Sequence, residues 1–184
     1  MNDMNFAKRN VSGLTLVELM ISAALLAIAI AALFGAFVGQ TVLNEHARNL
    51  SWAINDANRV MERLRQQNIG CASPSAAPPT GFASWDAWLA DTATGGGGKS
   101  LPQNPAINEL ITVTCQNRTG TAACTIGTDP VRLTIAVCWR HRSRTLGECT
   151  WSGTQLAASD GSNGFAVNGV IESSATLSTL MTCR

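Results

Sequence analysis

Residues 12–43 of the chain read SGLTLVELMISAALLAIAIAALFGAFVGQTVL, and this stretch decides the fold. Residues 19–38 are twenty consecutive uncharged residues, mostly Leu, Ile, Ala, Val and Phe. A run of this length crosses the apolar core of a bilayer as one helix. Glu18 lies just inside the apolar stretch. Because an unpaired acid costs about 2.5–3.5 kcal/mol at the centre of a membrane helix and less near its end, we expect Glu18 to have a partner.

A short basic leader with Lys8 and Arg9 precedes Gly13, and the sequence then continues LTLVELMI. This combination, with glutamate five residues after the glycine, closely resembles the N-terminus of type IV prepilins and of type II secretion pseudopilins. The resemblance implies that prepilin peptidase cleaves after Gly13, that the new amine on Leu14 is methylated, and that the mature chain assembles into a helical filament. Most members have Phe at the first mature position, where this chain has Leu14.

The position of Glu18 also has a physical interpretation. The amine freed on Leu14 is mostly protonated at neutral pH, and within the membrane Glu18 is its nearest complementary charge, on the same helix or on a neighbouring subunit. Such a pair offsets the desolvation of both groups. The resemblance implies that Glu18 of an incoming subunit contacts the terminal amine of a subunit already in the filament and so sets the axial register.

A secretory signal peptide or a plain membrane anchor also joins a basic segment to an apolar run. We prefer the prepilin interpretation because a signal peptide has no use for an acidic residue near the start of its apolar segment. Lys8 and Arg9 keep the N-terminal end in the cytoplasm and send the remainder across the inner membrane. We therefore expect a single-pass inner-membrane protein with a periplasmic C-terminal domain, which assembly then carries to a pilus at the cell surface.

Length and charge limit the function classes. The 184 residues carry 13 basic and 12 acidic side chains, and removal of residues 1–13 leaves 171 residues with 11 of each sign. A neutral chain has no general attraction to nucleic acid, so we do not expect DNA or RNA as a partner. The length suits one membrane helix and one globular domain of about 115 residues.

Six cysteines follow the apolar stretch, at Cys71, Cys115, Cys124, Cys138, Cys149 and Cys183. An even number in an oxidising compartment favours disulfides, and six cysteines allow fifteen pairings. We expect Cys115 with Cys124, Cys138 with Cys149, and Cys71 with Cys183. The chain has no CxxC pair and only two histidines, so no metal site and no cofactor is expected.

A helical pattern continues beyond the apolar stretch. Apolar residues recur at alternating spacings of four and three, which marks one face of a helix: Leu43, Ala47, Leu50, Ile54, Ala57, Met61 and Leu64. We expect a single helix over residues 14–69, about 84 Å long at 1.5 Å per residue, that ends at Gly70. We expect this face to pack on a sheet of the same chain rather than in a coiled coil, because two of its residues are Ala and the flanking charges show no regular complementarity.

Residues 71–106 contain five of the six prolines and the only glycine run, which is typical of a loop. Within it we expect a short helix over residues 84–90, capped by Ser84 and with Trp85, Trp88 and Leu89 on its apolar face. From residue 109 the pattern becomes extended. Strands are predicted at residues 109–115, 122–126, 131–139 and 148–152, with 165–171 and 175–181 as further candidates and turns at 117–120, 127–130 and 141–147.

The predicted fold class is therefore α+β, a pilin-like fold in which a long N-terminal helix packs on a small antiparallel sheet. We expect a leader at residues 1–13, a transmembrane and filament-core helix at 14–43, the second half of the helix at 44–70, and a β-rich domain at 71–184.

Three short motifs suggest other chemistry. The GGGGKS of residues 95–100 lacks the first glycine of a phosphate-binding loop, and Pro102 prevents the helix that such a loop requires, so we interpret the run as a flexible linker. The DGSNG of residues 160–164 lacks the second and third acidic or amide ligands of an EF-hand calcium loop. Because some secretion pseudopilins bind calcium in a C-terminal loop, a calcium loop here stays an alternative that we do not prefer. A basic cluster, Arg140, His141, Arg142 and Arg144, follows Trp139; stacking of bases on Trp139 or Trp151 is one hypothesis, and a solvated turn is the preferred one.

The chain has no GxSxG or HExxH motif and no evident carboxylate pair, so we do not expect an enzyme. The preferred interpretation is a minor pilin, a structural subunit that takes part in assembly or modification of a type IV pilus. Residues 55–67 and 131–140 resemble minor pilins of the PilV kind. The alternatives are a minor pseudopilin of a type II secretion system and a membrane-anchored periplasmic binding module or enzyme. The implied partners are other pilin subunits, prepilin peptidase and the inner membrane.

Overall fold

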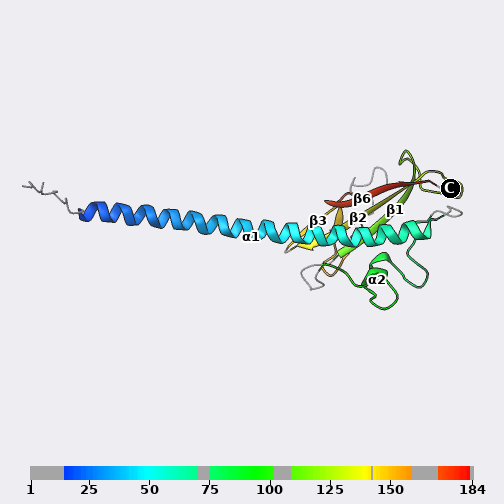
Figure 1. Ribbon diagram of the computed structural model, residues 1–184, viewed down its shortest axis with the longest axis horizontal. Helices are drawn as coiled ribbons and strands as arrows, with labels where there is room; N and C mark the ends of the chain where they lie inside the picture. Colours follow the sequence, from blue (N-terminus) through cyan, green and yellow to red (C-terminus); the bar gives the residue numbers. More distant parts are fainter. Residues whose placement is uncertain (1–14, 70–74, 102–108, 142, 159–169, 183–184) are drawn as a thin grey trace, which may run out of the picture. The chain divides into compact units, whose positions relative to one another are not determined.

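The computed structural model describes residues 15–69, 75–101, 109–141, 143–158 and 170–182. Contacts divide the chain into two compact units, Met1–Glu45 and His46–Arg184. The described elements are two helices and six strands (Figure 1), namely α1 (Leu16–Gln67), α2 (Trp85–Ala90), β1 (Glu109–Asn117), β2 (Val131–His141), β3 (Arg144–Leu146), β4 (Cys149–Trp151), β5 (Leu156–Ala158) and β6 (Ala175–Met181). Helix α1 contributes to both units, and each unit is described by itself.

The described part of the first unit is helix. It begins at Leu16, and its apolar side chains are exposed on every side. By length and composition α1 qualifies as a membrane span. A helix that is apolar all round is typical of a segment that a membrane or other helices surround.

In the second unit, residues 46–67 of α1 pack on an antiparallel sheet. Strand β2 lies in the middle: it pairs with β1 along one edge and with β6 and β3 along the other. Ala57, Val60 and Leu64 of α1 belong to one buried cluster with Leu133 and Ile135 of β2. The α+β class and the helix-on-sheet arrangement are therefore confirmed.

Both faces of β2 are buried, which explains its nearly continuous apolar sequence. Leu133, Ile135, Val137 and Trp139 belong to the cluster shared with α1. Ala136 and Cys138 belong to a second cluster with Cys149 of β4 and Leu156 of β5. The β4–β5 hairpin thus covers the face of the sheet opposite α1.

The buried face of α1 differs from the predicted one. Ala57, Met61 and Leu64 are buried as expected, but Leu43 and Ala47 are exposed and Ile54 is 36% exposed. The buried residues are instead Asn49, Ala53, Asp56, Ala57, Val60, Met61 and Leu64. The predicted face was therefore partly wrong. Leu50 packs half-buried against the core as expected, but the prediction missed Ala53 and Val60. It also missed two polar residues, Asn49 and Asp56, which are buried with hydrogen-bond partners from distant parts of the chain.

Several smaller elements also differ. Residues 122–126 form no strand; the segment contributes one isolated bridge, Gln116 to Ala123. The turn predicted at 141–147 contains β3, and β5 was not predicted. Residues 165–169 lie outside the described ranges, and residues 170–171 are not in a strand. The short helix is confirmed: Ser84 caps α2 by accepting from the Ala87 N–H at 3.0 Å, and Trp85, Trp88 and Leu89 are buried.

Candidate functional site

The first turn of α1 is built around Thr15 and Glu18. The Thr15 backbone N–H donates to Glu18 Oε2 at 3.4 Å, and the Glu18 N–H donates to Thr15 Oγ1 at 3.3 Å. The Leu19 N–H donates to the Thr15 carbonyl at 3.1 Å, which is the first backbone bond of the helix. This reciprocal pair is a capping box, in which each side chain satisfies a backbone donor that the helix leaves unpaired. The chain carries the signature of this motif, threonine followed three residues later by glutamate, but we did not predict the box.

The capping box gives Glu18 a local role besides the predicted one. A carboxylate in the first turn is also favoured by the helix dipole. The predicted cleavage site, Gly13 and Leu14, lies outside the described residues. Thr15 directly follows Leu14 in the chain, so the N–H that Glu18 accepts from is one residue from the amine that cleavage would create. The pairing of Glu18 with the Leu14 amine stays a prediction.

The side chains of residues 16–38 form an unpartnered apolar surface around the helix. The large ones are between 43% and 75% exposed; they include Leu16, Val17, Leu19, Met20, Ile21, Leu25, Leu26, Ile28, Ile30, Leu33, Phe34, Phe37 and Val38. An apolar surface of this extent is stable in a bilayer or against other apolar helices, and not in water. It can take part in helix packing.

Two disulfides join parts of the second unit. Cys115 of β1 is bonded to Cys124, and Cys138 of β2 to Cys149 of β4. These are two of the three expected pairs. The first ties the segment after β1 back to that strand, and the second ties the β4–β5 hairpin to the central strand. Cys71 and Cys183 lie outside the described residues, so the third pair stays a prediction.

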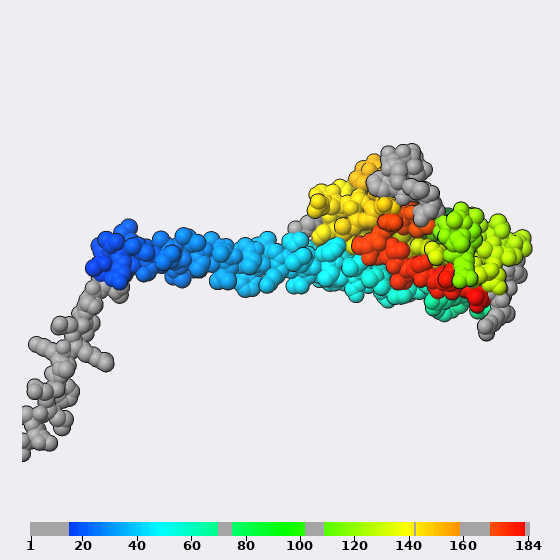
Figure 2. Space-filling view, turned by 90° about the horizontal axis from the view of Figure 1, so that it is seen from above, coloured from blue at the N-terminus to red at the C-terminus, as the bar shows by residue number. Residues whose placement is uncertain are grey.

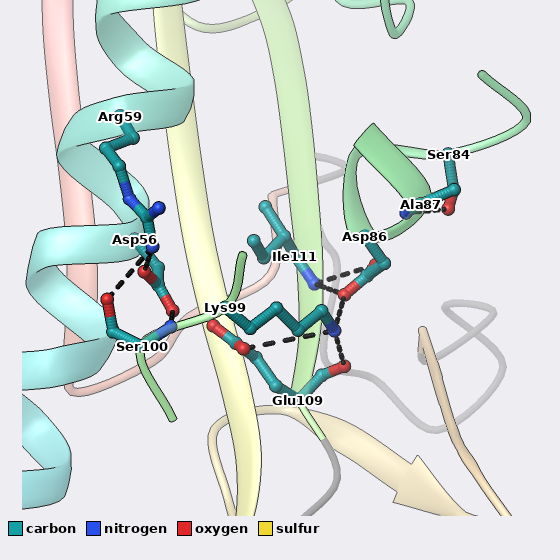
Figure 3. A network of polar contacts seen from close by, with 9 residues as sticks. All are labelled: Asp56, Arg59, Ser84, Asp86, Ala87, Lys99, Ser100, Glu109 and Ile111. Carbon is teal, nitrogen blue, oxygen red and sulfur yellow. Dashed lines mark hydrogen bonds and ion pairs between the residues drawn. The ribbon is translucent and has the colours of Figure 1, made fainter. Parts of the chain in front are cut away.

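A polar network that we did not predict connects α1 to the loop before β1. Asp56 is fully buried, pairs with Arg59, and accepts the Ser100 N–H at 2.7 Å (Figure 3). Arg59 also donates to Ser100 Oγ at 2.9 Å and to the Gly96 carbonyl at 2.7 Å. These contacts hold residues 96–100 against the helix.

The same loop places Lys99 beside two carboxylates. Lys99 Nζ lies 2.7 Å from Asp86 Oδ1 of α2 and 3.9 Å from Glu109 Oε2 of β1, and it donates to the Glu109 carbonyl at 3.0 Å (Figure 3). Asp86 also accepts the Ile111 N–H, at 3.3 Å from Oδ1 and 3.2 Å from Oδ2. Burial raises the pKa of Glu109 to about 8, against the opposing effect of Lys99 and with the support of the Asp56 and Asp86 carboxylates. At neutral pH Glu109 is therefore mostly protonated.

The glycine run is part of this packing and is not a free linker, which corrects our interpretation. The N–H groups of Gly96 and Gly98 donate to the Trp88 and Leu89 carbonyls at the end of α2, at 2.7 and 2.8 Å. The Gly95 N–H donates to Asp91 Oδ1 at 3.1 Å. A Cβ at Gly96 would lie 2.8 Å from Leu89 Cδ1 and 3.0 Å from Trp88 Cζ3. The glycine run therefore packs closely against the C-terminal end of α2, and these three N–H groups already donate hydrogen bonds within the chain.

The aromatic residues near the basic cluster are engaged within the second unit. Trp139 is fully buried and stacks against His46, with ring centroids 6.4 Å apart. The Arg140 guanidinium lies over the Trp151 ring at 4.0 Å from its centroid. His141 Nδ1 lies 3.1 Å from Asn49 Nδ2. Trp139 is therefore not available to stack on a base, and the DNA-stacking hypothesis loses that residue.

Metal ligation finds no support in the described residues, which contain no group of three or more His, Cys, Asp or Glu side chains placed to hold an ion. The candidate calcium loop at 160–164 lies outside the described ranges.

Comparison with known proteins gives one match. Residues 8–34 fit the family model of the prokaryotic N-terminal methylation motif. No curated protein and no solved structure matches the chain. The motif supports a type IV pilin or pseudopilin and thus suggests a structural subunit. It also fits a single-pass, membrane-anchored chain that prepilin peptidase processes and that associates with other pilins.

Proposed function

We propose that the chain is a minor pilin, a subunit that enters a type IV pilus through its N-terminal helix and modifies or primes the filament. The observation that carries the proposal is the N-terminal segment itself. It joins the methylation motif of residues 8–34 to a helix whose apolar side chains are exposed on every side. Removal of the leader after Gly13 would leave Leu14 as the first residue, with Glu18 in the first helical turn.

Assembly follows from the physical chemistry of this segment. Before assembly the bilayer covers the apolar side chains, and in the filament the same helices of neighbouring subunits cover one another. Glu18 is the only charged side chain in residues 14–38, so a cation of the assembling filament, the Leu14 amine, is its complement. The second unit, held by its own core and two disulfides, would then form the outside of the filament.

Substitution of Glu18 tests the proposal. We expect Glu18→Ala to insert in the inner membrane at the normal level and to be missing from sheared filaments. Ser22→Ala is the matched control: it changes a polar residue one turn further along the same face, and its hydroxyl donates only to the Glu18 carbonyl in the same helix. Normal incorporation of Glu18→Ala would contradict the proposal.

The methylation motif equally supports a minor pseudopilin of a type II secretion system. The two functions differ in the material that contains the protein. A pilin appears in the surface filaments of the wild-type strain, whereas a pseudopilin remains in the envelope, and its deletion blocks the export of folded hydrolases.

A further inference from the structure

The four-stranded sheet has two outer edges, and the chain treats them differently. The exposed edge of a sheet presents a row of backbone N–H and C=O groups that needs partners. On β1 these partners are present. Its outward groups bond to side chains and loops at four residues: Glu109 O with Lys99 Nζ at 3.0 Å, Ile111 N with Asp86 at 3.2 Å, Cys115 O with Cys124 N at 3.0 Å, and Asn117 N with Ala122 O at 2.9 Å.

The register shows which groups of β6 point outward. The outward groups of β1 belong to odd-numbered residues, so its even-numbered residues bond to the even-numbered residues of β2. The odd-numbered residues of β2 therefore bond to their partners in β6, which are also odd-numbered. The backbone N–H and C=O groups of Thr176, Ser178 and Leu180 consequently face away from the sheet. Within the described ranges, no strand other than β2 pairs with β6.

Nothing in the sequence of β6 protects this edge. Natural edge strands are short, or carry charges, proline or a bulge, which prevent another strand from adding. Strand β6, ATLSTLM, has seven residues and includes neither a charged residue nor a proline. Its side chains at Thr176, Ser178 and Leu180 are exposed, and the strand lies along the surface of the second unit, in red in Figure 2.

A groove beside the edge can receive a side chain. It has a volume of about 390 Å³ and lies between the end of α1 and β6. Its apolar lining comes from Ile69, Leu180 and Met181, of which Ile69 is 79% and Leu180 52% exposed. Arg65, from the polar part of the lining, approaches Thr179 Oγ1 with its guanidinium at 3.5 Å.

We propose that the outer edge of β6 binds an extended segment of another protein, which adds to the sheet as a fifth strand. The outward N–H and C=O groups of Thr176, Ser178 and Leu180 alternate along the edge. An extended polypeptide backbone has donors and acceptors at the same spacing, so the partner is a peptide strand. Strand β6 is uncharged, and the two charged residues of the groove lining, Glu62 and Arg65, lie 4.0 Å from each other. The incoming strand is therefore mainly apolar and places one apolar side chain beside Ile69 and Met181.

A second copy of the chain is the less suitable occupant. Strand β6 runs in the same direction as residues 46–67 of α1: its first residue pairs with Val137, close to the Trp139 that stacks on His46, and its later residue Thr179 contacts Arg65. Antiparallel pairing of two β6 strands would therefore point the α1 helices of the two copies in opposite directions. The exclusion of a second copy rests on the proposed function, because subunits of one filament share one polarity. The binding of a peptide strand to β6 does not rest on the proposed function.

Peptide binding tests the proposal directly. The probe is a fluorescein-labelled peptide with the sequence of residues 131–137, VRLTIAV, which pairs with β6 in the fold. Fluorescence anisotropy with the full chain in detergent micelles is expected to show saturable binding, and micelles alone are expected to show none. Absence of saturable binding up to about 1 mM, the weakest affinity expected for such a site, overturns the proposal.

One pair of variants isolates the backbone contribution. Ser178→Pro removes an outward N–H and places its ring on the open edge, and we expect it to weaken binding at least about tenfold. Ser178→Ala is the matched control: both variants lose the hydroxyl that lies 3.1 Å from Thr134 Oγ1, but Ser178→Ala keeps the N–H and is expected to bind normally. Equal binding by both variants overturns the proposal.

Two further measurements complete the test. Ser178→Lys adds an edge-protecting charge without a backbone constraint, and it replaces Ser178→Pro if urea unfolding shows that the proline variant is not folded. Analytical ultracentrifugation of the full chain in micelles detects self-association. A dimer that Ser178→Pro dissolves assigns the edge to a second copy and overturns the choice of partner. Incorporation of Ser178→Ala into filaments reports on the proposed function separately from peptide binding.

Discussion

The raised pKa of Glu109 makes the stability of the second unit depend on pH. Burial raises the pKa of this carboxyl from 4.5 to about 8. In this range the folded state holds a proton that the unfolded chain releases, so the free energy of unfolding falls as pH rises. The contribution is fully present below about pH 4.5 and is lost as pH rises through about 8. One pKa unit corresponds to about 1.4 kcal/mol, so the loss is about 3 kcal/mol by pH 7 and about 5 kcal/mol above pH 8.

Glu109→Gln removes this titration while it keeps the shape of the side chain. Lys99 retains Asp86 at 2.7 Å and the backbone carbonyl of residue 109 at 3.0 Å, so the variant leaves no unpaired cation. We expect the variant and the wild-type protein to have similar stability near pH 5, and the variant to be about 3 kcal/mol more stable at pH 7.

Urea unfolding of the full chain in micelles, followed by tryptophan fluorescence, measures this difference. All five tryptophans lie after residue 45, so the signal reports on the second unit. With an m-value of about 2 kcal/mol/M, the difference at pH 7 is a midpoint shift of about 1.5 M. Glu62→Gln, at a side chain 63% exposed, is the control: it keeps Glu109 and should follow the wild-type stability curve across the same pH range. Parallel stability curves for Glu109→Gln and the wild-type protein from pH 5 to 8 would show that Glu109 holds no extra proton in the folded state.

Three further predictions concern the stability of the second unit. Gly147→Ala places a Cβ 2.7 Å from Cys138 Sγ at a backbone φ of +97°, so we expect a lower urea midpoint and a loss of at least about 2 kcal/mol in the free energy of unfolding. Gly153→Ala is the control: its φ is +99° but its Cβ meets nothing within 4 Å, so the loss should be only about 1 kcal/mol. Replacement of both Cys138 and Cys149 by Ser should cost about 3 kcal/mol in the same assay, because the bridge closes a short loop; equal midpoints with and without reductant in the wild-type protein would contradict this. Lys99→Met should cost about 3 kcal/mol at pH 7, since it leaves the mostly buried Asp86 carboxylate without its cation, and an unchanged midpoint would contradict the electrostatic role of Lys99.

The elements that local sequence specifies were predicted well. Residues 19–38 are apolar without interruption, so α1 needed no knowledge of the rest of the chain. Ser84 and the tryptophans after it specified α2 within one turn. Strand β2 is a long β-branched and apolar run, and β1 and β6 also carry enough local signal. In these segments periodicity and capping act over a few residues.

The features that depend on distant partners were not predicted. Asn49 and Asp56 look like solvent-facing residues of a helix, and their burial depends on His141 and Ser100, which lie 92 and 44 residues away. Strands β3 and β5 have three residues each, too few to show a period. Glu109 resembles any polar residue at the start of a strand, and its neighbour Lys99 is positioned by a loop that we interpreted as flexible.

In the candidate site, too, the features specified by local sequence were predictable and those that depend on distant partners were not. The motif around Gly13 and Glu18 was recognisable because its spacing is fixed in the chain, and the family model of the methylation motif matches the same segment. The capping box of Thr15 and Glu18 could have been predicted from the same segment, because its spacing is also fixed in the chain. The edge of β6 was not, because whether a strand lies at an edge depends on which other strands pair with it.

The charge pairing and the filament role both depend on the chemical nature of the mature N-terminus. Mass spectrometry of the protein purified from filaments or membranes determines it. We expect a mature chain that begins at an N-methylated Leu14, so that a cation stands four residues before Glu18. A mature chain that still begins at Met1, or that starts downstream of Gly39, would contradict both the charge pairing and the filament role.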